Sequence, residues 1–330
     1  MHIPDGYLSP ETCAAAVVVA APALVASVRR IRSSLGTRQV PLLAMFSAVT
    51  SLVMMLNVPV PGGTTAHVMG SVMIAIALGP AAATVAVSVS LLFQALLFAD
   101  GGVLSLGANI VNMAVLAPWA GWAVYRFVVG LAPARRAVAG FVAGYVGINV
   151  AALGTAIMLG VQPILFHAAD GTPLYSPYPL AVTLPVMVAA HGLVVGPLEG
   201  AVTVAALSAL QRWGMLPDVG ADRPTRVRPA VIGGILGALV LLAPLGLLAT
   251  GTAFAEEAPE ELDLGAFGLR SIPAGMARWA DAWRHAPFPD YTVAGLSPTV
   301  GYVISAVLGA GLLVAVVFLL VRRFPRPERI

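Results

Sequence analysis

The chain has 330 residues, of which 59% are hydrophobic and only 10% charged, and its mean hydropathy is +0.91. These values exclude a soluble domain of ordinary composition and indicate a membrane protein that crosses the bilayer several times. The small net charge of +3 comes from 18 arginines with no lysine, placed in short loops beside apolar runs, so nucleic acid is not an expected partner. A single cysteine, Cys13, excludes a disulfide framework and a thiolate metal site.

In chain order, the apolar runs predict an all-α protein with about nine transmembrane helices. Each run approaches the roughly 20 residues that a helix needs to cross about 30 Å of hydrocarbon. The predicted spans are 12–28, 40–57, 67–79, 81–99, 106–127, 137–160, 180–211, 229–249 and 298–321.

Arginine clusters predict the orientation, because loops on the cytoplasmic side carry an excess of basic residues. Clusters follow the first, fifth, seventh and ninth predicted spans, and only Arg270, Arg278 and Arg284 fall on the other side. This pattern places the N-terminus outside and the C-terminus in the cytoplasm.

Polar segments divide the chain into two units. Residues 1–217 form a predicted seven-span unit, and residues 229–330 form a two-span hairpin whose loop, 250–297, is long, acidic and extracytoplasmic. A cytoplasmic linker rich in proline and arginine, 218–228, joins them. The hairpin carries one histidine and several carboxylates, and no cluster of metal ligands is expected in it.

The first two residues can form a metal chelate. A free α-amine, the amide nitrogen between Met1 and His2, and Nδ1 of His2 close fused five- and six-membered rings that hold three nitrogens in one plane. One further imidazole, His67, would complete a square, the geometry that Ni(II) and Cu(II) favour. This requires the amine to remain free: His2 is too bulky for Met1 to be trimmed, and the tail lacks the basic region of a secretory signal.

His67 follows a loop, 57–66, that contains two prolines and two glycines. Irregular backbone at membrane depth is tolerated only when it lines a cavity or is buried in protein. We expect His67 to begin the third span, with Thr64 and Thr65 capping the free N–H groups of that helix. A histidine at this place, on the same side as Met1-His2, is a candidate ligand.

Several motifs resemble the CbiM/NikM substrate-binding components of energy-coupling factor (ECF) transporters, over about residues 1–217. They are Met-His-Ile-Pro-Asp-Gly-Tyr-Leu-Ser-Pro at 1–10, Gly-Gly-Thr-Thr-Ala-His-Val-Met-Gly at 62–70, Leu-Gly-Pro at 78–80, Gln-Ala-Leu-Leu-Phe-Ala-Asp-Gly-Gly at 94–102, Gly-Ala-Asn-Ile-Val-Asn-Met at 107–113 and His-Gly-Leu-Val-Val-Gly-Pro-Leu-Glu-Gly at 191–200. The hairpin, with Pro-Phe-Pro-Asp-Tyr at 287–291, resembles the CbiN/NikN-type accessory subunit.

The resemblance implies a function, a ligand set and partners. Members of this family bind Co(II) or Ni(II) through the Met1 amine, the backbone nitrogen and imidazole of His2, and the histidine that matches His67. It also implies a bacterial cell membrane, a CbiQ/NikQ-like coupling subunit and CbiO/NikO-like ATPases. The transported ion would be Ni(II) or Co(II), with no organic cofactor, and the fused hairpin favours Ni(II).

Other polar residues have a functional and an ordinary interpretation. Asp5 is expected to hold the tail folded, Asp100 is either turn chemistry or a second shell around the cation, and Gln94, Asn109 and Asn112 either bond neighbouring helices or orient the metal-site loop. His191 and Glu199 are eight residues apart on one helix face, about 12 Å, which is too far to share one ion. They are expected to form a structural polar pair or a contact for a partner subunit.

Three function classes compete on the sequence. A metal-binding component of an ATP-driven importer is favoured; such a component is no enzyme, and a sequence without lysine cannot form a Walker A loop of its own. The alternative is a secondary transporter or channel for divalent transition-metal cations, which would need carboxylates near the bilayer midplane, where Glu199 is a candidate. An intramembrane metalloprotease is excluded by the lack of a His-Glu-x-x-His segment.

Overall fold

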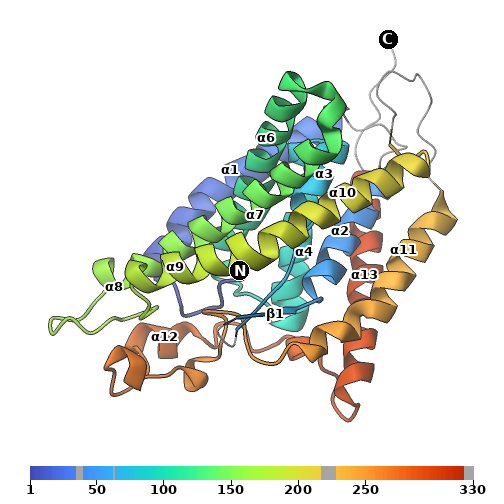
Figure 1. The fold of residues 1–330 in the computed structure, drawn as a ribbon. Coiled ribbons are helices and arrows are strands. Elements are labelled where there is room, and N and C mark those ends of the chain that lie inside the picture. The colour runs from blue at the N-terminus through green and yellow to red at the C-terminus, as the bar shows by residue number, and fades with distance from the viewer. Residues whose placement is uncertain (35–39, 62–63, 217–227, 323–330) are drawn as a thin grey trace.

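The structure is a computed structural model that describes residues 1–34, 40–61, 64–216 and 228–322. It is built almost entirely of helices (Figure 1), and seven of its helical runs are long and apolar enough to cross a membrane. The prediction of an all-α polytopic membrane protein is therefore confirmed. Residues 218–227 of the predicted linker lie outside the described ranges.

The seven long runs match seven of the predicted spans. They are α1 (Pro10–Ser34), α4 with η1 (Pro80–Phe93, Gln94–Phe98), α5 with η2 and α6 (Leu106–Asn109, Ile110–Leu116, Ala117–Leu131), α7 with α8 (Arg136–Gly160, Gln162–Leu165), α9 with η4 and α10 (Leu180–Ala190, His191–Val195, Gly196–Arg212), α11 with η5 (Pro229–Leu242, Ala243–Leu248) and α13 (Pro298–Arg322). A 3₁₀ turn, η3 (Pro133–Arg135), joins α6 to α7.

The other two predicted spans are short helices. α2 (Val40–Met54) has 15 residues and α3 (Ser71–Leu78) has 8. At about 1.5 Å per residue they reach roughly 22 and 12 Å, less than the 30 Å of a hydrocarbon core. Their apolar runs therefore reflect burial inside the protein as much as contact with lipid.

α2 lies at the centre of the molecule. Every residue of this helix except Pro41 is buried, as expected for a helix that is apolar on all faces. The hairpin helices α11 and α13 pack along it (Figure 1), and the Tyr302 hydroxyl of α13 donates to the Met55 carbonyl at 2.8 Å. The accessory hairpin is thus part of the wall around this central helix.

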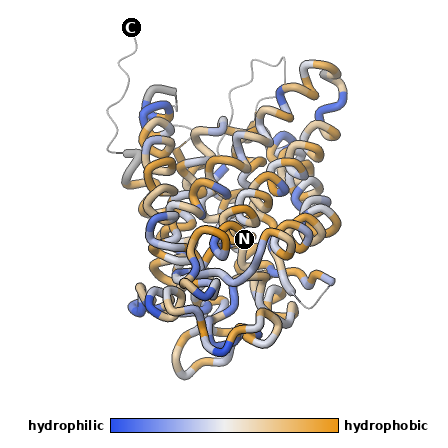
Figure 2. The backbone as a smooth tube through the Cα atoms, turned by 90° about the vertical axis from the view of Figure 1, so that its left-hand side faces the viewer, coloured by the Kyte–Doolittle hydropathy of each residue, from blue (hydrophilic) through white to orange (hydrophobic). Residues whose placement is uncertain are grey.

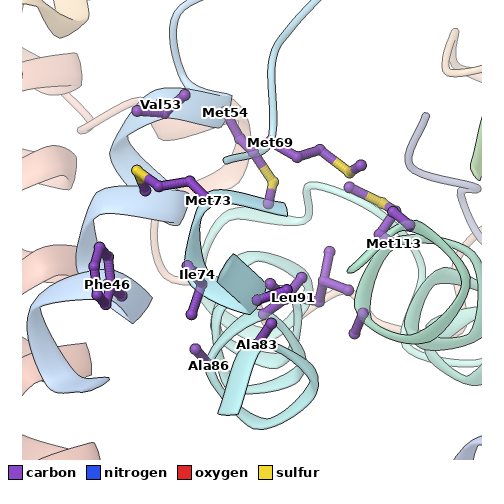
Figure 3. Packing of buried hydrophobic residues seen from close by; sticks show 14 of the residues in the cluster. Phe46, Val53, Met54, Met69, Met73, Ile74, Ala83, Ala86, Leu91 and Met113 are labelled. Atoms are coloured by element: carbon purple, nitrogen blue, oxygen red, sulfur yellow. The ribbon is translucent and has the colours of Figure 1, made fainter. Parts of the chain in front are cut away.

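Side chains from α2, α3, α4 and η2 meet in one apolar core around the short helix α3 (Figure 3). The labelled residues include four methionines, Met54, Met69, Met73 and Met113, each at most 3% exposed. Because methionine is unbranched and adaptable, it fills the irregular spaces that short helices leave. This core supports the loop that precedes α3.

Polar residues are concentrated in the segments outside the helices. Figure 2 shows the helices largely orange, with blue stretches along the bottom and at the top right. At one end, the N-terminal residues, the hairpin of β1 (Val58–Val60) and β2 (Thr64–Ala66), and the long loop between η5 and α13 come together (Figure 1). That loop contains η6 (Pro259–Glu261), η7 (Gly265–Phe267), α12 (Ala274–Trp279) and η8 (Pro289–Tyr291).

Three of the long runs contain a π-helical segment, and each segment carries a buried polar residue. Gln94 begins η1, Asn112 lies in η2, and His191 begins η4. Wide turns of this kind are frequent at functional sites, because they redirect one side chain without ending the helix.

Candidate metal centre

The first nine residues, which we call the tail, fold back into the protein. Met1, His2 and Ile3 are 5%, 3% and 0% exposed. Asn109 holds this segment by pairing with both backbone groups of Ile3: its Oδ1 accepts from the Ile3 N–H at 2.9 Å, and its Nδ2 donates to the Ile3 carbonyl at 3.2 Å. The side-chain amide of Asn109 thus binds the backbone of the tail as a neighbouring β-strand would.

Asp5 fixes the tail at a second point. Its carboxylate accepts hydrogen bonds from three consecutive N–H groups, those of Val103, Leu104 and Ser105, at 3.0, 2.8 and 3.1 Å from the nearer oxygen. Burial raises the pKa of this carboxyl, while the three N–H groups act to lower it. Asp5 thereby ties the tail to the turn that follows Gly102.

Gly102 permits this close approach. Its N–H donates to the Ile3 carbonyl at 2.9 Å, and a Cβ at this position would lie 2.0 Å from Asp5 Oδ1. Any larger residue would push the tail away from the turn at 101–105.

His67 is positioned by a strand and a buried carboxylate, and not by a helix end. Thr64 and Thr65 belong to β2, which pairs antiparallel with β1, and α3 begins only at Ser71. The prediction that these threonines cap a helix starting at His67 is wrong, because residues 64–66 pair with residues 58–60 as a strand before the helix begins.

Glu199, and not the two threonines, accepts hydrogen bonds from backbone N–H groups immediately before α3. It is fully buried, and its two carboxylate oxygens accept from the N–H groups of Met69 and Gly70 at 2.7 and 2.8 Å. These groups directly precede α3, where the helix dipole favours a negative charge. Glu199 thereby holds the backbone two residues after His67.

His2 and His67 lie side by side. Their ring centroids are 5.0 Å apart at an interplanar angle of 31°, and both residues are at most 4% exposed. Among the described residues neither Nε2 has a hydrogen-bond partner. An unpartnered buried polar atom costs about 1–3 kcal/mol, so a pair of them indicates a site for a ligand.

Nδ1 of each ring makes its own polar contact, so the lone pair of Nε2 is free. His67 Nδ1 lies 3.2 Å from the Val68 carbonyl, and His2 Nδ1 lies 3.1 Å from Asp100 Oδ1. Burial lowers the pKa of the His67 imidazole well below its usual range, and the N-terminal ammonium and His2 add to the lowering. His67 is therefore a neutral imidazole, the form that binds metal.

A polar network supports Asp100 from behind. Gln94 Nε2 lies 3.3 Å from both Asp100 Oδ2 and the Tyr291 hydroxyl, and the Tyr291 hydroxyl donates to Asp100. Burial and the Asp100 charge raise the pKa of Tyr291 well above its usual range, which keeps it a donor. The structure thus brings Asp100 next to His2, with Gln94 and Tyr291 bound to Asp100.

The accessory hairpin (residues 229–330) also supplies a carboxylate to the centre. The N-terminal ammonium of Met1 forms an ion pair with Glu256. One ligand atom each from His2, His67 and Glu256 lie within 4.8 Å of one another. From its sequence, the accessory hairpin is expected to hold no ligand cluster. Glu256 was not identified there because nothing local distinguishes this glutamate from its acidic neighbours.

Residues 251–262, which we call the strap, bring Glu256 to the tail. The strap is tied by Glu257, whose carboxylate accepts from Tyr178 and whose carbonyl accepts from Tyr7 at 2.8 Å. It also meets the β-hairpin, through a bridge between Thr65 and Ala253. These contacts place the strap across the first residues of the chain.

A cavity of about 310 Å³ adjoins these groups. It is lined by His2, His67, Asp100 and Glu256 together with parts of the hairpin, among them Gly246, Asp290 and Tyr291. Tail, β-hairpin and accessory hairpin therefore all face one polar space.

Two other predicted candidates, Asn112 and His191, make their hydrogen bonds outside the pair of imidazoles, although His191 lies near enough to contribute to the lowered pKa of His67. Asn112 donates to Thr155 Oγ1 at 3.2 Å and so joins two helices. His191 Nδ1 contacts the Met187 carbonyl at 2.9 Å within its own helix, and its Nε2 is also unpartnered among the described residues. His191 and Glu199 do not contact each other as a polar pair, since Glu199 binds the backbone before α3.

Comparison with known proteins gives close relatives over nearly the whole chain. The fused nickel transport protein NikMN of Rhodobacter capsulatus is 43% identical over 335 residues, which covers 96% of this chain and 95% of that protein. Two solved chains also match, a transition metal transporter and a truncated transition metal transporter. Each has a TM-score of 0.62 and 47% identity, covering 65% and 64% of this chain and 94% and 99% of theirs.

Family models match both parts of the chain. The model for the cobalt uptake substrate-specific transmembrane region, CbiM, matches residues 2–215, which include the tail, the β-hairpin and Glu199. The model for the PDGLE domain matches residues 228–326, which include the strap and Tyr291. The chain therefore belongs to the CbiM family and carries a PDGLE domain behind its CbiM region.

Proposed function

We propose that this protein is the substrate-binding membrane component of an ATP-driven ECF-type importer and that its substrate is Ni(II) or Co(II). Residues 1–217 would form the metal-binding unit and residues 229–330 an accessory hairpin. The cation would be held by four nitrogens in a plane: the Met1 amine, the His2 amide nitrogen, His2 Nδ1 and one nitrogen of His67. The site would face the outside of a bacterial cell membrane.

The observation that carries this proposal is the pair of buried imidazoles beside the chain's amino terminus. Two histidines 65 residues apart in sequence have their rings 5.0 Å apart, with an unpartnered Nε2 on each. The Met1 side chain is 1% exposed, and the Met1 amine lies at the same centre, paired with Glu256. Because nitrogen donors in this arrangement suit late divalent transition metals, nickel and cobalt are the substrates of choice.

Closing the planar site requires two local changes. The amine must exchange Glu256 for the cation, and the His2 ring must turn so that Nδ1 leaves Asp100. Both carboxylates lie beside the groups that they release.

Nickel is favoured over cobalt as the substrate. A plane of four nitrogens gains most from low-spin d⁸ Ni(II), whereas Co(II) gains less from that geometry. NikMN of Rhodobacter capsulatus, which covers 96% of this chain, is named as a fused nickel transport protein.

Energy would come from separate subunits, a coupling membrane protein and ATPases of the CbiQ/NikQ and CbiO/NikO types. The alternative, a secondary transporter or channel, would use Glu199 as its intramembrane proton carrier. Both oxygens of Glu199 accept backbone N–H groups before α3, so this carboxylate is committed to structure. The geometry favours the importer component.

The ligand set can be tested by Ni(II) titration of the purified full-length protein, with visible absorption and magnetic susceptibility as readouts. We expect one yellow, diamagnetic Ni(II) complex per chain. His2→Ala, His67→Ala and insertion of one glycine before Met1 should each abolish it. His285→Ala, at an exposed loop histidine, is the matched control and should bind like the wild type.

Planar binding that persisted after the glycine insertion would show that the amine is not a ligand. Loss of binding in the His285→Ala control would show that the effect of histidine removal is not specific to the centre. Either result would remove the basis of the proposed ligand set.

A further inference from the structure

Two of the four nitrogens of the proposed planar site are engaged by carboxylates. Glu256 pairs with the Met1 ammonium, and Asp100 contacts His2 Nδ1 at 3.1 Å. The nitrogens that face the centre without a partner are instead the Nε2 atoms of His2 and His67. The described arrangement therefore offers a different donor set from the planar one.

We propose that Glu256 and the Nε2 atoms of His2 and His67 form a mixed nitrogen–oxygen site that binds the incoming divalent cation before the planar site closes. This inference rests on the proposed function, because it assigns the first step of loading to the same centre. It gives the accessory hairpin a chemical role as the source of one ligand.

The distances suit this role. One ligand atom from each of the three residues lies within 4.8 Å of the others. In a tetrahedral site with bonds of about 2.0–2.1 Å, neighbouring ligand atoms are roughly 3.3 Å apart. The three ligand atoms therefore need to close by no more than about 1.5 Å, through small shifts of the His2, His67 and Glu256 side chains.

Glu256 sits on an anchored segment. The neighbouring Glu257 binds Tyr178 and Tyr7, so the strap is held on the protein while the Glu256 side chain remains able to turn. The Glu256 side chain is 16% exposed and lines the 310 Å³ cavity together with His2 and His67. A cation in the cavity would meet this carboxylate at the edge of the centre.

Loading would take two steps, binding in the mixed site and closure of the planar site, and neither step changes an oxidation state. In the first, the cation gives up bound water for two imidazole nitrogens and a Glu256 oxygen. In the second, the Met1 ammonium and the His2 amide each lose a proton to water, and Glu256 and His2 Nε2 leave the metal. The Nδ1 proton of His2 passes through water to Nε2 and the ring turns, so that the amine, the amide nitrogen and Nδ1 take the released positions. An oxygen ligand that needs no deprotonation can thus hold the cation until the slower loss of the amide proton is complete.

Binding of Zn(II) is expected to distinguish the mixed site from the planar site. Zn(II) is bound by histidine nitrogen and carboxylate oxygen in tetrahedral sites and has no d-electron preference for a plane. Ni(II) prefers a plane of nitrogens. Zn(II) should therefore stop in the mixed site and depend on Glu256, whereas Ni(II) at equilibrium should not.

The experiment compares the full-length wild type with Glu256→Gln and with Glu260→Gln, an exposed carboxylate in the same strap. Glu256→Gln should weaken Zn(II) binding at least about tenfold, or ~1.4 kcal/mol, and slow Ni(II) loading in stopped flow by a similar factor. Its Ni(II) affinity at equilibrium should stay within about threefold of the wild type. Glu260→Gln should change none of the three quantities.

Equal Zn(II) affinities in Glu256→Gln and Glu260→Gln would overturn the inference. So would an equal loss of Zn(II) and Ni(II) affinity, since Glu256 would then be a ligand of the final site. X-ray absorption of the wild-type Zn(II) complex is independent of the variants: two imidazoles and at least one oxygen are expected, and a complex without imidazole would overturn the mixed site. Failure of the proposed function has a separate signature, the absence of a planar Ni(II) complex in the wild type.

Discussion

At the scale of single residues, the tail is held by side chains that replace ordinary backbone pairing. Asn109 binds both backbone groups of Ile3, and Asp5 accepts three N–H groups from the turn after Gly102. Each of these contacts is buried or nearly so, and each lies within a few residues of the Met1 amine. The position of the amine is therefore set by residues that need not touch the metal.

Asn109→Ala should lower Ni(II) affinity while leaving the helical fold intact. The substitution removes two buried hydrogen bonds to Ile3, worth about 1–3 kcal/mol together, which corresponds to roughly a five- to hundredfold weaker binding. Isothermal titration of Ni(II) into the purified protein measures the change.

Asn112→Ala is the matched control for this prediction. Asn112 lies in the same helical run but bonds Thr155 and not the tail backbone, so its loss should lower the unfolding temperature and spare Ni(II) affinity. An Asn109→Ala protein that bound Ni(II) as tightly as the wild type would show that the tail is held without it.

At the scale of elements, the short helix α3 depends on Glu199. Glu199→Gln keeps one acceptor but turns an amide group toward a backbone N–H, either that of Met69 or that of Gly70. A hydrogen bond to a charged group contributes about 1.5–3 kcal/mol, so the unfolding free energy should fall by that order and Ni(II) affinity should fall with it. Thermal unfolding and Ni(II) titration of the same samples test both effects.

Glu11→Gln serves as the control, because Glu11 is an exposed carboxylate in the first turn of α1. Its replacement should change stability by less than about 0.5 kcal/mol. If Glu199→Gln behaved like Glu11→Gln, the buried carboxylate would not be supporting the His67 loop.

The docking of the accessory hairpin on α2 depends on one glycine. A Cβ at Gly246 would lie 2.1 Å from the Met55 carbonyl oxygen, so Gly246→Ala must push η5 away from the end of α2. We expect a lower unfolding temperature and faster protease cleavage in the strap, because Gly246 is only five residues before it. Limited proteolysis followed by mass spectrometry locates the cut.

Gly237→Ala tests the same type of change where space is open. No atom lies within 4 Å of a Cβ at Gly237, among the parts of the chain that the structure describes, and alanine favours a helix by up to ~1 kcal/mol over glycine. Its stability should equal or exceed that of the wild type. Equal behaviour of the two variants would mean that η5 is not closely packed on α2.

The parts of the fold and site that the sequence predicts are those governed by local chemistry. Long apolar runs predict helices, and the Met1-His2 chelate depends on adjacent atoms. Thr64 and Thr65 were misassigned because strand pairing across a Pro-Gly segment competes with capping and leaves little local signal. Glu199 and Glu256 act on residues 130 and 255 positions away, which only the packed structure can reveal.

At the scale of the whole molecule, transport should require other chains. Cells that produce this protein alone should bind ⁶³Ni(II) at the membrane but accumulate it slowly. Co-expression with CbiQ/NikQ-like and CbiO/NikO-like subunits should raise uptake at least about tenfold. An ATPase variant that cannot hydrolyse ATP is the control and should return uptake to the lower level.

Rapid uptake by the protein alone, driven by a proton gradient and abolished by an uncoupler, would favour the secondary transporter instead. In that case Glu199 would have to release the backbone groups of Met69 and Gly70 in each cycle.

The contact between Met1 and Glu256 also constrains how the protein is made. The two residues are 255 positions apart, so Met1 meets its partner only after more than three quarters of the chain has been synthesised. Contacts of such separation form late, because the loop they close is long and its entropy must be offset by earlier packing. The amino terminus is thus expected to be one of the last parts to settle, which would keep the centre from trapping a metal ion on a half-built chain.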